Sequence, residues 1–137
     1  MKTAEMMRRI QNAKTLTRIL RDIPDFPEFG EYFKALLNEQ DIKKDVFFKR
    51  AGISTVYGHE ILRGKKKPSR DTIIQLALTL GLDIEKTQEI LKIGGAAELY
   101  PKIKRDTIFI FGITNKQKIE DVNIKLLEND LPILGKY

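Results

Sequence analysis

Residues 42–68, IKKDVFFKRAGISTVYGHEILRGKKKP, decide the fold of this 137-residue chain. They predict two short helices joined by a tight turn at residues 51–54 and followed by a basic loop. Gly52 stands where a helix ends best, because glycine adopts positive φ without strain. Ser54 is a preferred N-cap for the second helix, and Gly64 and Pro68 separate that helix from the next one. The pattern is typical of a helix-turn-helix.

Apolar spacing predicts which faces of these two helices pack together. A stripe with spacings of three and four residues runs along the first helix through Val46, Phe47, Arg50 and Ala51. The second helix is expected to bury Tyr57, Gly58 and Ile61. Its outer face then consists of Thr55, Val56, His59, Glu60 and Arg63.

Positive charge is concentrated in the same part of the chain. Residues 42–70 carry nine lysines and arginines against two acidic residues, a net charge of +7, whereas the whole chain has a net charge of +6. The remaining residues are therefore close to neutral. A basic patch on a helix-turn-helix is typical of a nucleic-acid-binding protein.

Residues 29–83 resemble the Xre family, the phage-repressor-like helix-turn-helix proteins. The turn Gly52, the N-cap Ser54, Gly64 and the basic loop 65–69 stand at the spacings of that family, and so does the helix predicted over residues 70–80. The resemblance implies an all-α fold, a lambda-repressor-like five-helix bundle, here extended by a C-terminal helical hairpin. It also implies a homodimer that binds palindromic double-stranded DNA.

The resemblance assigns roles to individual side chains. Thr55 and Val56 would enter the major groove first, with His59 and Glu60 one turn further along the helix. Methyl groups of Thr and Val suit thymine, and a glutamate can accept a hydrogen bond from cytosine N4. The expected phosphate-binding residues are Lys43, Lys44, Arg63, Lys65, Lys66 and Lys67.

Three positions depart from the family pattern. The family usually has a small residue at the position of Phe48 and a branched apolar residue at that of Gly58. One interpretation is an exchange of volumes that keeps the two helices packed. The alternative is a poorly formed recognition helix, because glycine within a helix costs about 1 kcal/mol relative to alanine. At Lys44, many members have a glutamine; lysine still binds phosphate, as a point charge.

The flanking regions also read as helices, and no segment is a convincing strand. A basic amphipathic helix is expected over residues 3–21, either packed on the bundle or acting as an arm that touches DNA or a partner subunit. Two prolines in residues 23–28 break it. The next helix, over residues 28–39, should bury Phe29, Phe33, Leu36 and Leu37. We therefore divide the chain into an N-terminal helix and linker (1–27), the helix-turn-helix bundle (28–100) and a C-terminal extension (101–137).

An internal repeat marks the C-terminal half. Arg70-Asp71-Thr72-Ile73 recurs 35 residues later as Arg105-Asp106-Thr107-Ile108, and further identities follow at the same offset. Such a spacing is typical of stacked helical hairpins; chance similarity between two amphipathic hairpins is the alternative. We expect residues 102–134 to stack on the bundle and cover helix 84–93. The almost wholly apolar helix 106–114 indicates a central position or a dimer interface.

Composition argues against several classes of protein. Cysteine is absent, which excludes disulfides and thiolate metal sites. The single histidine and two serines form no nucleophile–base pair. We expect no enzymatic activity, no metal and no cofactor. No apolar run approaches the roughly 18 residues of a membrane span and no signal peptide is evident, so we expect a cytoplasmic protein without a membrane partner.

Two functions remain open at this point. The first is a sequence-specific double-stranded DNA-binding transcriptional regulator, a repressor that reads the major groove with residues 54–63. The second is a protein–protein interaction adaptor that has lost DNA readout, for which Glu60 and Gly58 would be signs of decay. An antitoxin would combine both roles. The sequence does not identify the operator, the regulated genes or any effector.

Overall fold

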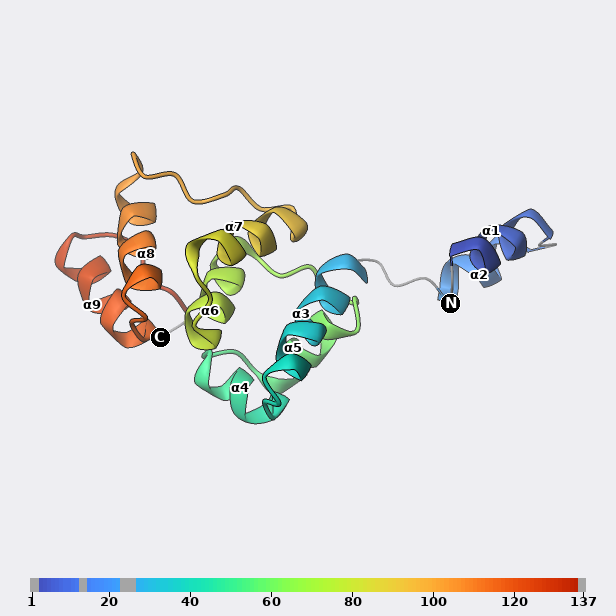
Figure 1. Ribbon diagram of the computed structural model, residues 1–137, viewed down its shortest axis with the longest axis horizontal. Helices are drawn as coiled ribbons and strands as arrows, with labels where there is room; N and C mark the ends of the chain where they lie inside the picture. Colours follow the sequence, from blue (N-terminus) through green and yellow to red (C-terminus); the bar gives the residue numbers. More distant parts are fainter. Residues whose placement is uncertain (1–2, 13–14, 23–26, 136–137) are drawn as a thin grey trace.

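All regular secondary structure is helical in the residues that the computed structural model describes, which are 3–12, 15–22 and 27–135. The predicted all-α fold is therefore confirmed. The helices, labelled in Figure 1, are α1 (Thr3–Asn12), α2 (Leu16–Asp22), α3 (Pro27–Glu39), α4 (Lys44–Arg50), α5 (Thr55–Leu62), α6 (Arg70–Leu80), α7 (Ile84–Ile93), α8 (Lys104–Thr114) and α9 (Ile119–Glu128).

The single helix expected over residues 3–21 is wrong, because two shorter helices take its place. Thr15 lies outside both α1 and α2 and directly precedes Leu16. Threonine is a favoured residue immediately before a helix, where its hydroxyl can cap exposed amides. Figure 1 shows α1 and α2 at one end of the molecule, separated from the other helices. We refer to residues 3–22 as the arm.

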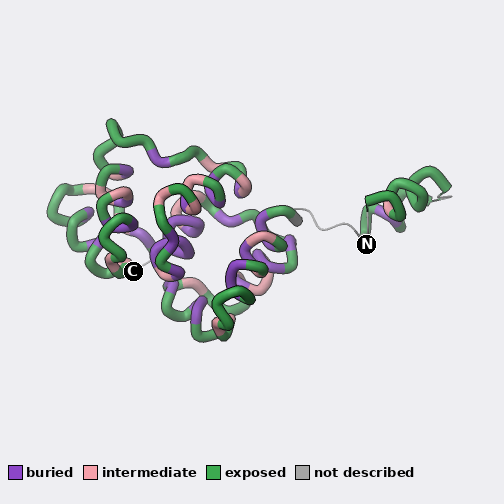
Figure 2. Tube along the Cα trace, viewed as in Figure 1, coloured by how far each residue is buried: buried purple, intermediate pink, exposed green. Residues whose placement is uncertain are grey.

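The core of the body is built around a row of aromatic rings. Phe29 and Phe33 of α3 are stacked, and Phe33 contacts Phe47 of α4, which lies edge-on to Phe48. All four side chains are buried, as are Leu36 and Leu37, which confirms the inner face predicted for α3. Helix α3 packs on α5 and α7, while α6 packs on α4 and α7. Buried residues run along the inner sides of these helices in Figure 2.

The 35-residue repeat in the sequence is also a repeat in structure. Helices α6 and α7 form the first hairpin, and α8 and α9 form the second hairpin. In the first, the Gln88 amide donates to the Leu99 carbonyl and accepts from the Leu99 N–H. Asn123 makes the same two bonds with Leu134 in the second. Both pairs are offset by 35 residues, so each hairpin fixes its own C-terminal segment in the same way.

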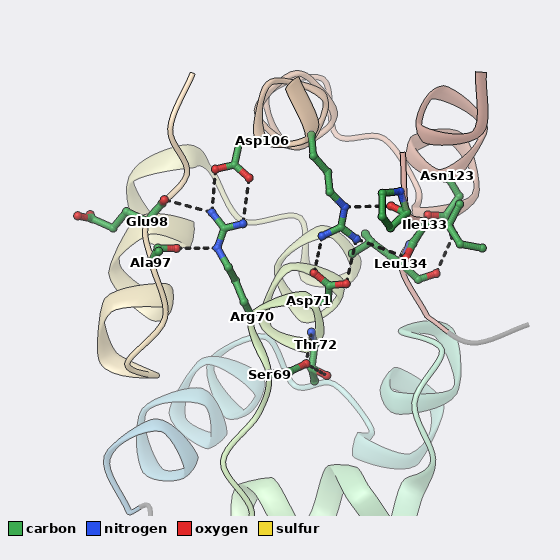
Figure 3. Close-up of polar contacts among 12 residues, drawn as sticks. Ser69, Arg70, Asp71, Thr72, Ala97, Glu98, Asp106, Asn123, Ile133 and Leu134 are labelled. Carbon is green, nitrogen blue, oxygen red and sulfur yellow. Dashed lines mark hydrogen bonds and ion pairs between the residues drawn. The ribbon is translucent and has the colours of Figure 1, made fainter. Parts of the chain in front are cut away.

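The two hairpins are joined by two reciprocal ion pairs at the starts of α6 and α8. Arg70 donates both terminal guanidinium nitrogens to Asp106, at 2.9 and 2.8 Å. Arg105 does the same to Asp71, at 2.8 and 2.9 Å. Figure 3 shows the guanidinium group of Arg70 facing the carboxylate of Asp106. Arginine and carboxylate match in this fork geometry, which fixes orientation as well as distance.

The contacts between the two hairpins differ from the one-directional stack that the sequence predicts. In a solenoid, each repeat contacts its neighbours in one repeated direction. Here α6 packs on both α8 and α9, while α8 packs on both α6 and α7, so each hairpin contacts the other through the same set of elements. This is the pattern of a two-fold pair, in which equivalent residues exchange contacts. The second hairpin therefore pairs with the first across α6 and α7 and does not extend a stack over α7 alone.

Asp106 lies at the most buried point of this junction. Its side chain is 2% exposed, whereas that of Asp71 is 40% exposed. Burial raises the pKa of Asp106, but hydrogen bonds from Arg70 and the Tyr100 N–H and the nearby positive charges outweigh it, so the pKa lies below its ordinary value. The hydrogen bond to Asp106 raises the pKa of Arg70. Both groups are therefore charged in the folded protein at neutral pH.

Because Asp106 is more buried than Asp71, we expect removal of its arginine to destabilise the fold more. Arg70→Met should lower the free energy of unfolding by about 3–5 kcal/mol, because it leaves a buried charge unpaired. Arg105→Met, the matched control, loses equivalent bonds to backbone carbonyls but strands a partly exposed carboxylate and should cost about 1 kcal/mol. Urea unfolding of the two variants measures the difference. Equal losses would contradict the role given to Asp106.

Stability should also depend on pH through Asp106. Because its pKa is lower in the folded protein than in the unfolded chain, its contribution is fully present above the ordinary aspartate pKa of about 3.9. The contribution is lost as the pH falls through the folded-state pKa. Thermal unfolding between neutral and acid pH should show a smaller loss in Asp106→Asn than in the wild-type chain. Parallel profiles would contradict the prediction.

Candidate nucleic-acid interface

The helix-turn-helix predicted by residues 42–68 is present as α4, a tight turn and α5. Gly52 has φ +77°, which glycine alone adopts freely. The chain then turns so that the Ile53 N–H donates to the Phe48 carbonyl, and Ile53 packs against the core. The Ser54 hydroxyl accepts a hydrogen bond from the Tyr57 N–H at 3.1 Å, which caps α5. Local residue chemistry therefore accounts for both the turn and the start of α5.

Phe48 and Gly58 form the compensated pair that their exchanged sizes predict. Phe48 is 1% exposed, and Gly58 is buried against it. A Cβ atom added at Gly58 would lie 2.4–2.6 Å from three carbons of the Phe48 ring, closer than carbon atoms can approach. The ring thus fills the space that a side chain at residue 58 would need. Glycine at this position allows α4 and α5 to approach closely.

The inner face of α4 differs from the predicted stripe. Phe47 and Ala51 are buried as expected, but Val46 is 54% exposed and Arg50 is also exposed. Phe48 takes their place in the core because Gly58 leaves room for its ring. The inner face of α4 is therefore turned by roughly one residue, and Val46 and Arg50 become surface residues.

The base-reading candidates on α5 differ in accessibility. Thr55 and Val56, in the first turn, are exposed, and Val56 is 69% exposed. Glu60 and His59 are half-buried. His59 Nε2 lies 2.7 Å from Asp45 Oδ1 on α4, and its ring lies edge-on to Phe48 with 5.4 Å between centroids. His59 therefore links α5 to α4, and the structure leaves Thr55 and Val56 as the most accessible of the four.

Asp45 is a residue that sequence reasoning missed. In the sequence it stands out only as one of two acidic residues in the basic stretch. Its position at the start of α4, fourteen residues before His59, carries no periodic signal because the contact crosses the turn. Only the packing of α4 against α5 brings the two side chains together.

The predicted phosphate-binding residues stand at the start of α4 and in the loop after α5, and we call them the exposed border. Lys43, Arg63, Lys65, Lys66 and Lys67 are exposed and Lys44 is half-buried. Gly64 has φ +73°, and after it the N–H groups of Lys65 and Lys66 both donate to the Glu60 carbonyl. This bond pattern holds the basic loop at the end of α5. The ammonium group of Lys67 lies beside Gly95, close to where a Cβ atom of residue 95 would be, so Lys67 reaches toward the end of α7.

Arg70 belongs to the basic stretch in sequence but not to the exposed border. Its guanidinium group is taken up by Asp106 and by the carbonyls of Ala97 and Glu98. It is therefore a structural cation.

In residues 3–12, 15–22 and 27–135, no three His, Cys, Asp or Glu side chains are grouped so that they could hold a metal ion. None of the helices described is long and apolar enough to cross a lipid bilayer.

Comparison with known proteins gives no relative: no family model, no curated protein and no solved structure matches the chain.

The Phe48–Gly58 contact predicts that a larger residue at position 58 destabilises the fold. Gly58→Leu should lower the free energy of unfolding by about 1–3 kcal/mol through overpacking, although leucine favours helix over glycine by nearly 1 kcal/mol. Phe48→Ala alone should cost about 3–5 kcal/mol by leaving a cavity. The double variant should lose much less than the sum of the two. Additive losses in chemical unfolding would show that the residues do not share one space.

Proposed function

We propose that this protein is a sequence-specific double-stranded DNA-binding transcriptional regulator, a repressor that reads the major groove with α5. The observation that carries the proposal is the accessible first turn of α5, Thr55 and Val56, in a helix-turn-helix that also carries the exposed cations Lys43, Arg63, Lys65, Lys66 and Lys67. A helix presented in this way offers side chains to base edges while cations of the same helix-turn-helix contact phosphates.

The accessibility of each residue suggests its role on DNA. Thr55 and Val56 contact bases first, where their methyl groups suit thymine. Glu60 lies one turn further along and can accept a hydrogen bond from cytosine N4. His59 keeps α5 oriented through Asp45 and contributes to base contact second. Lys43, Lys44, Arg63, Lys65 and Lys66 neutralise phosphates, and Lys67 joins them by leaving its position near Gly95.

The second hairpin serves as a scaffold in this proposal. Residues 102–134 carry six lysines and arginines against five acidic residues, a balance that gives DNA phosphates little attraction. Its Asp106 holds Arg70, the first residue of α6, directly after the basic loop that ends at Ser69. The hairpin thus fixes the base of the loop that carries the phosphate contacts. We expect the protein to act in the cytoplasm as a homodimer.

An adaptor that binds another protein is the second candidate, and the pairing of His59 with Asp45 favours it. His59 is taken up by that contact and Glu60 is half-buried. Thr55 and Val56 are therefore the only exposed members of the base-reading set, all of which lies in the described residues. An adaptor makes no base contacts, so it would not need His59 and Glu60 to be accessible. The measurement below separates the two candidates.

The salt dependence of binding to duplex DNA tests the proposal. If about five phosphates are neutralised per subunit, the logarithm of the binding constant should fall with the logarithm of salt concentration at a slope of about −4 to −5. Replacing Lys65, Lys66 and Lys67 by alanine should flatten the slope by about 2–3 units and weaken specific and random duplexes alike. Fluorescence anisotropy over a salt series provides both values.

A triple variant of exposed lysines on the second hairpin, at positions 102, 104 and 118, is the matched control and should keep the wild-type slope. No binding to duplex at low salt, or equal effects of the two triple variants, would argue for the adaptor.

A further inference from the structure

The second hairpin exposes large apolar side chains that no described part of the chain covers. Phe111 of α8 is 57% exposed, and Ile124 and Leu127 of α9 are 52% and 63% exposed. The inner side of α8 packs in the core, where Phe109 and Ile113 are buried. The prediction that the apolar helix 106–114 is buried on several sides is therefore correct only for its inner side.

The internal repeat shows what such a face does in the first hairpin. Leu76 is the equivalent of Phe111 at the 35-residue offset, and it is 1% exposed in a helix that packs on α4. Glu89 is the equivalent of Ile124, and the Tyr32 hydroxyl of α3 lowers the pKa of Glu89. Lys86, one turn before it, donates to the same hydroxyl. The first hairpin thus binds amphipathic helices through positions that the second hairpin leaves open.

The open positions of α9 are acidic as well as apolar. Glu120 and Glu128 are exposed one turn before and one turn after Ile124, so the three share one side of the helix. Asp121 is exposed beside them, and Lys125, which pairs with Glu128 at 3.2 Å, offsets one of the negative charges. Phe111 is exposed on the neighbouring helix α8. We call the exposed side of α9 that carries Ile124, Glu120, Asp121 and Glu128 the open face. It fits a helix that is apolar on one side and positively charged.

The arm is apolar and positively charged, so it complements the apolar and acidic open face. Met7 and Ile10 of α1 are 54% and 45% exposed, and Leu16 and Leu20 of α2 are 64% and 56% exposed. Each pair is spaced by three or four residues, so each forms an apolar side on its helix. Residues 3–22 carry five lysines and arginines against two acidic residues, a net charge of +3.

We propose that the arm of one copy docks on the open face of a second copy, and that two such contacts form a homodimer. The arm lies at the end of the molecule opposite α8 and α9 (Figure 1), so we assign the docked arm to another chain. Apolar residues of the arm would cover Phe111 and Ile124, while its arginines face the acidic residues of α9. The proposal stands independently of DNA binding.

Charge reversal on each side of the contact tests the proposal. Arg8→Glu with Arg18→Glu changes the arm, and Glu120→Lys with Glu128→Lys changes the open face. Each double variant should weaken dimerisation by about 100-fold or more in sedimentation equilibrium at low salt, because repulsion replaces attraction. An equimolar mixture of the two should again form dimers, since each reversed arm then meets a reversed face and each unchanged arm an unchanged face.

The controls keep the result interpretable. Glu98→Lys reverses an exposed charge outside the open face and should leave the dimer unchanged. Circular dichroism and thermal unfolding establish that every variant is folded. Mixing that restores the dimer supports exchange of arms between copies. A monomeric wild-type chain, a dimer that survives both reversals or a mixture that stays monomeric would overturn the proposal.

Discussion

The paired ion bridges between the starts of α6 and α8 are the constraint on which the rest of the structure depends. Asp106 is buried, and a buried carboxylate is tolerated only when a cation and hydrogen bonds satisfy it. Arg70 and the Tyr100 N–H meet that requirement. Because Arg70 is also the first residue of α6, the same contact fixes the start of the helix on which the helix-turn-helix packs.

This constraint links the C-terminal hairpin to the candidate DNA-binding surface. The basic loop of residues 65–67 runs from the end of α5 to Ser69, which caps α6 through the Thr72 N–H. The loop is anchored at one side by the Glu60 carbonyl and at the other by the junction between Arg70 and Asp106. Anchoring at both ends restricts the backbone of the loop before DNA binds. Less conformational entropy is then lost when the lysines contact phosphates.

The parts of the fold that depend on local chemistry could be predicted from the sequence. Gly52, Ser54 and Gly64 act within one or two turns of themselves, so their roles follow from residue type and spacing alone. The Phe48–Gly58 contact crosses between helices, yet it was predictable because the two sizes are exchanged together relative to the family pattern. The all-α fold follows from the same helical periodicities.

Other features depend on how helices meet, and residue spacing does not determine that. The repeated Arg-Asp dipeptide was visible at residues 70 and 105, but a repeat alone does not distinguish a one-way stack from a two-fold pair. The recurrence of adjacent opposite charges at the start of equivalent helices, Arg70-Asp71 and Arg105-Asp106, is the signal that could have indicated reciprocal bridges. The roles of Asp45 and Val46 depended on the rotation of α4 about its axis, which the Phe48–Gly58 contact sets.

The central claim is that α5 and the basic loop contact DNA while the second hairpin supports them. Amide chemical-shift mapping by NMR, with the full chain titrated by a random-sequence duplex at low salt, tests this claim most directly. We expect the largest shifts in residues 43–44 and 54–67 and small shifts in α8 and α9. Shifts concentrated in α8 and α9, or no shifts at all, would contradict the account.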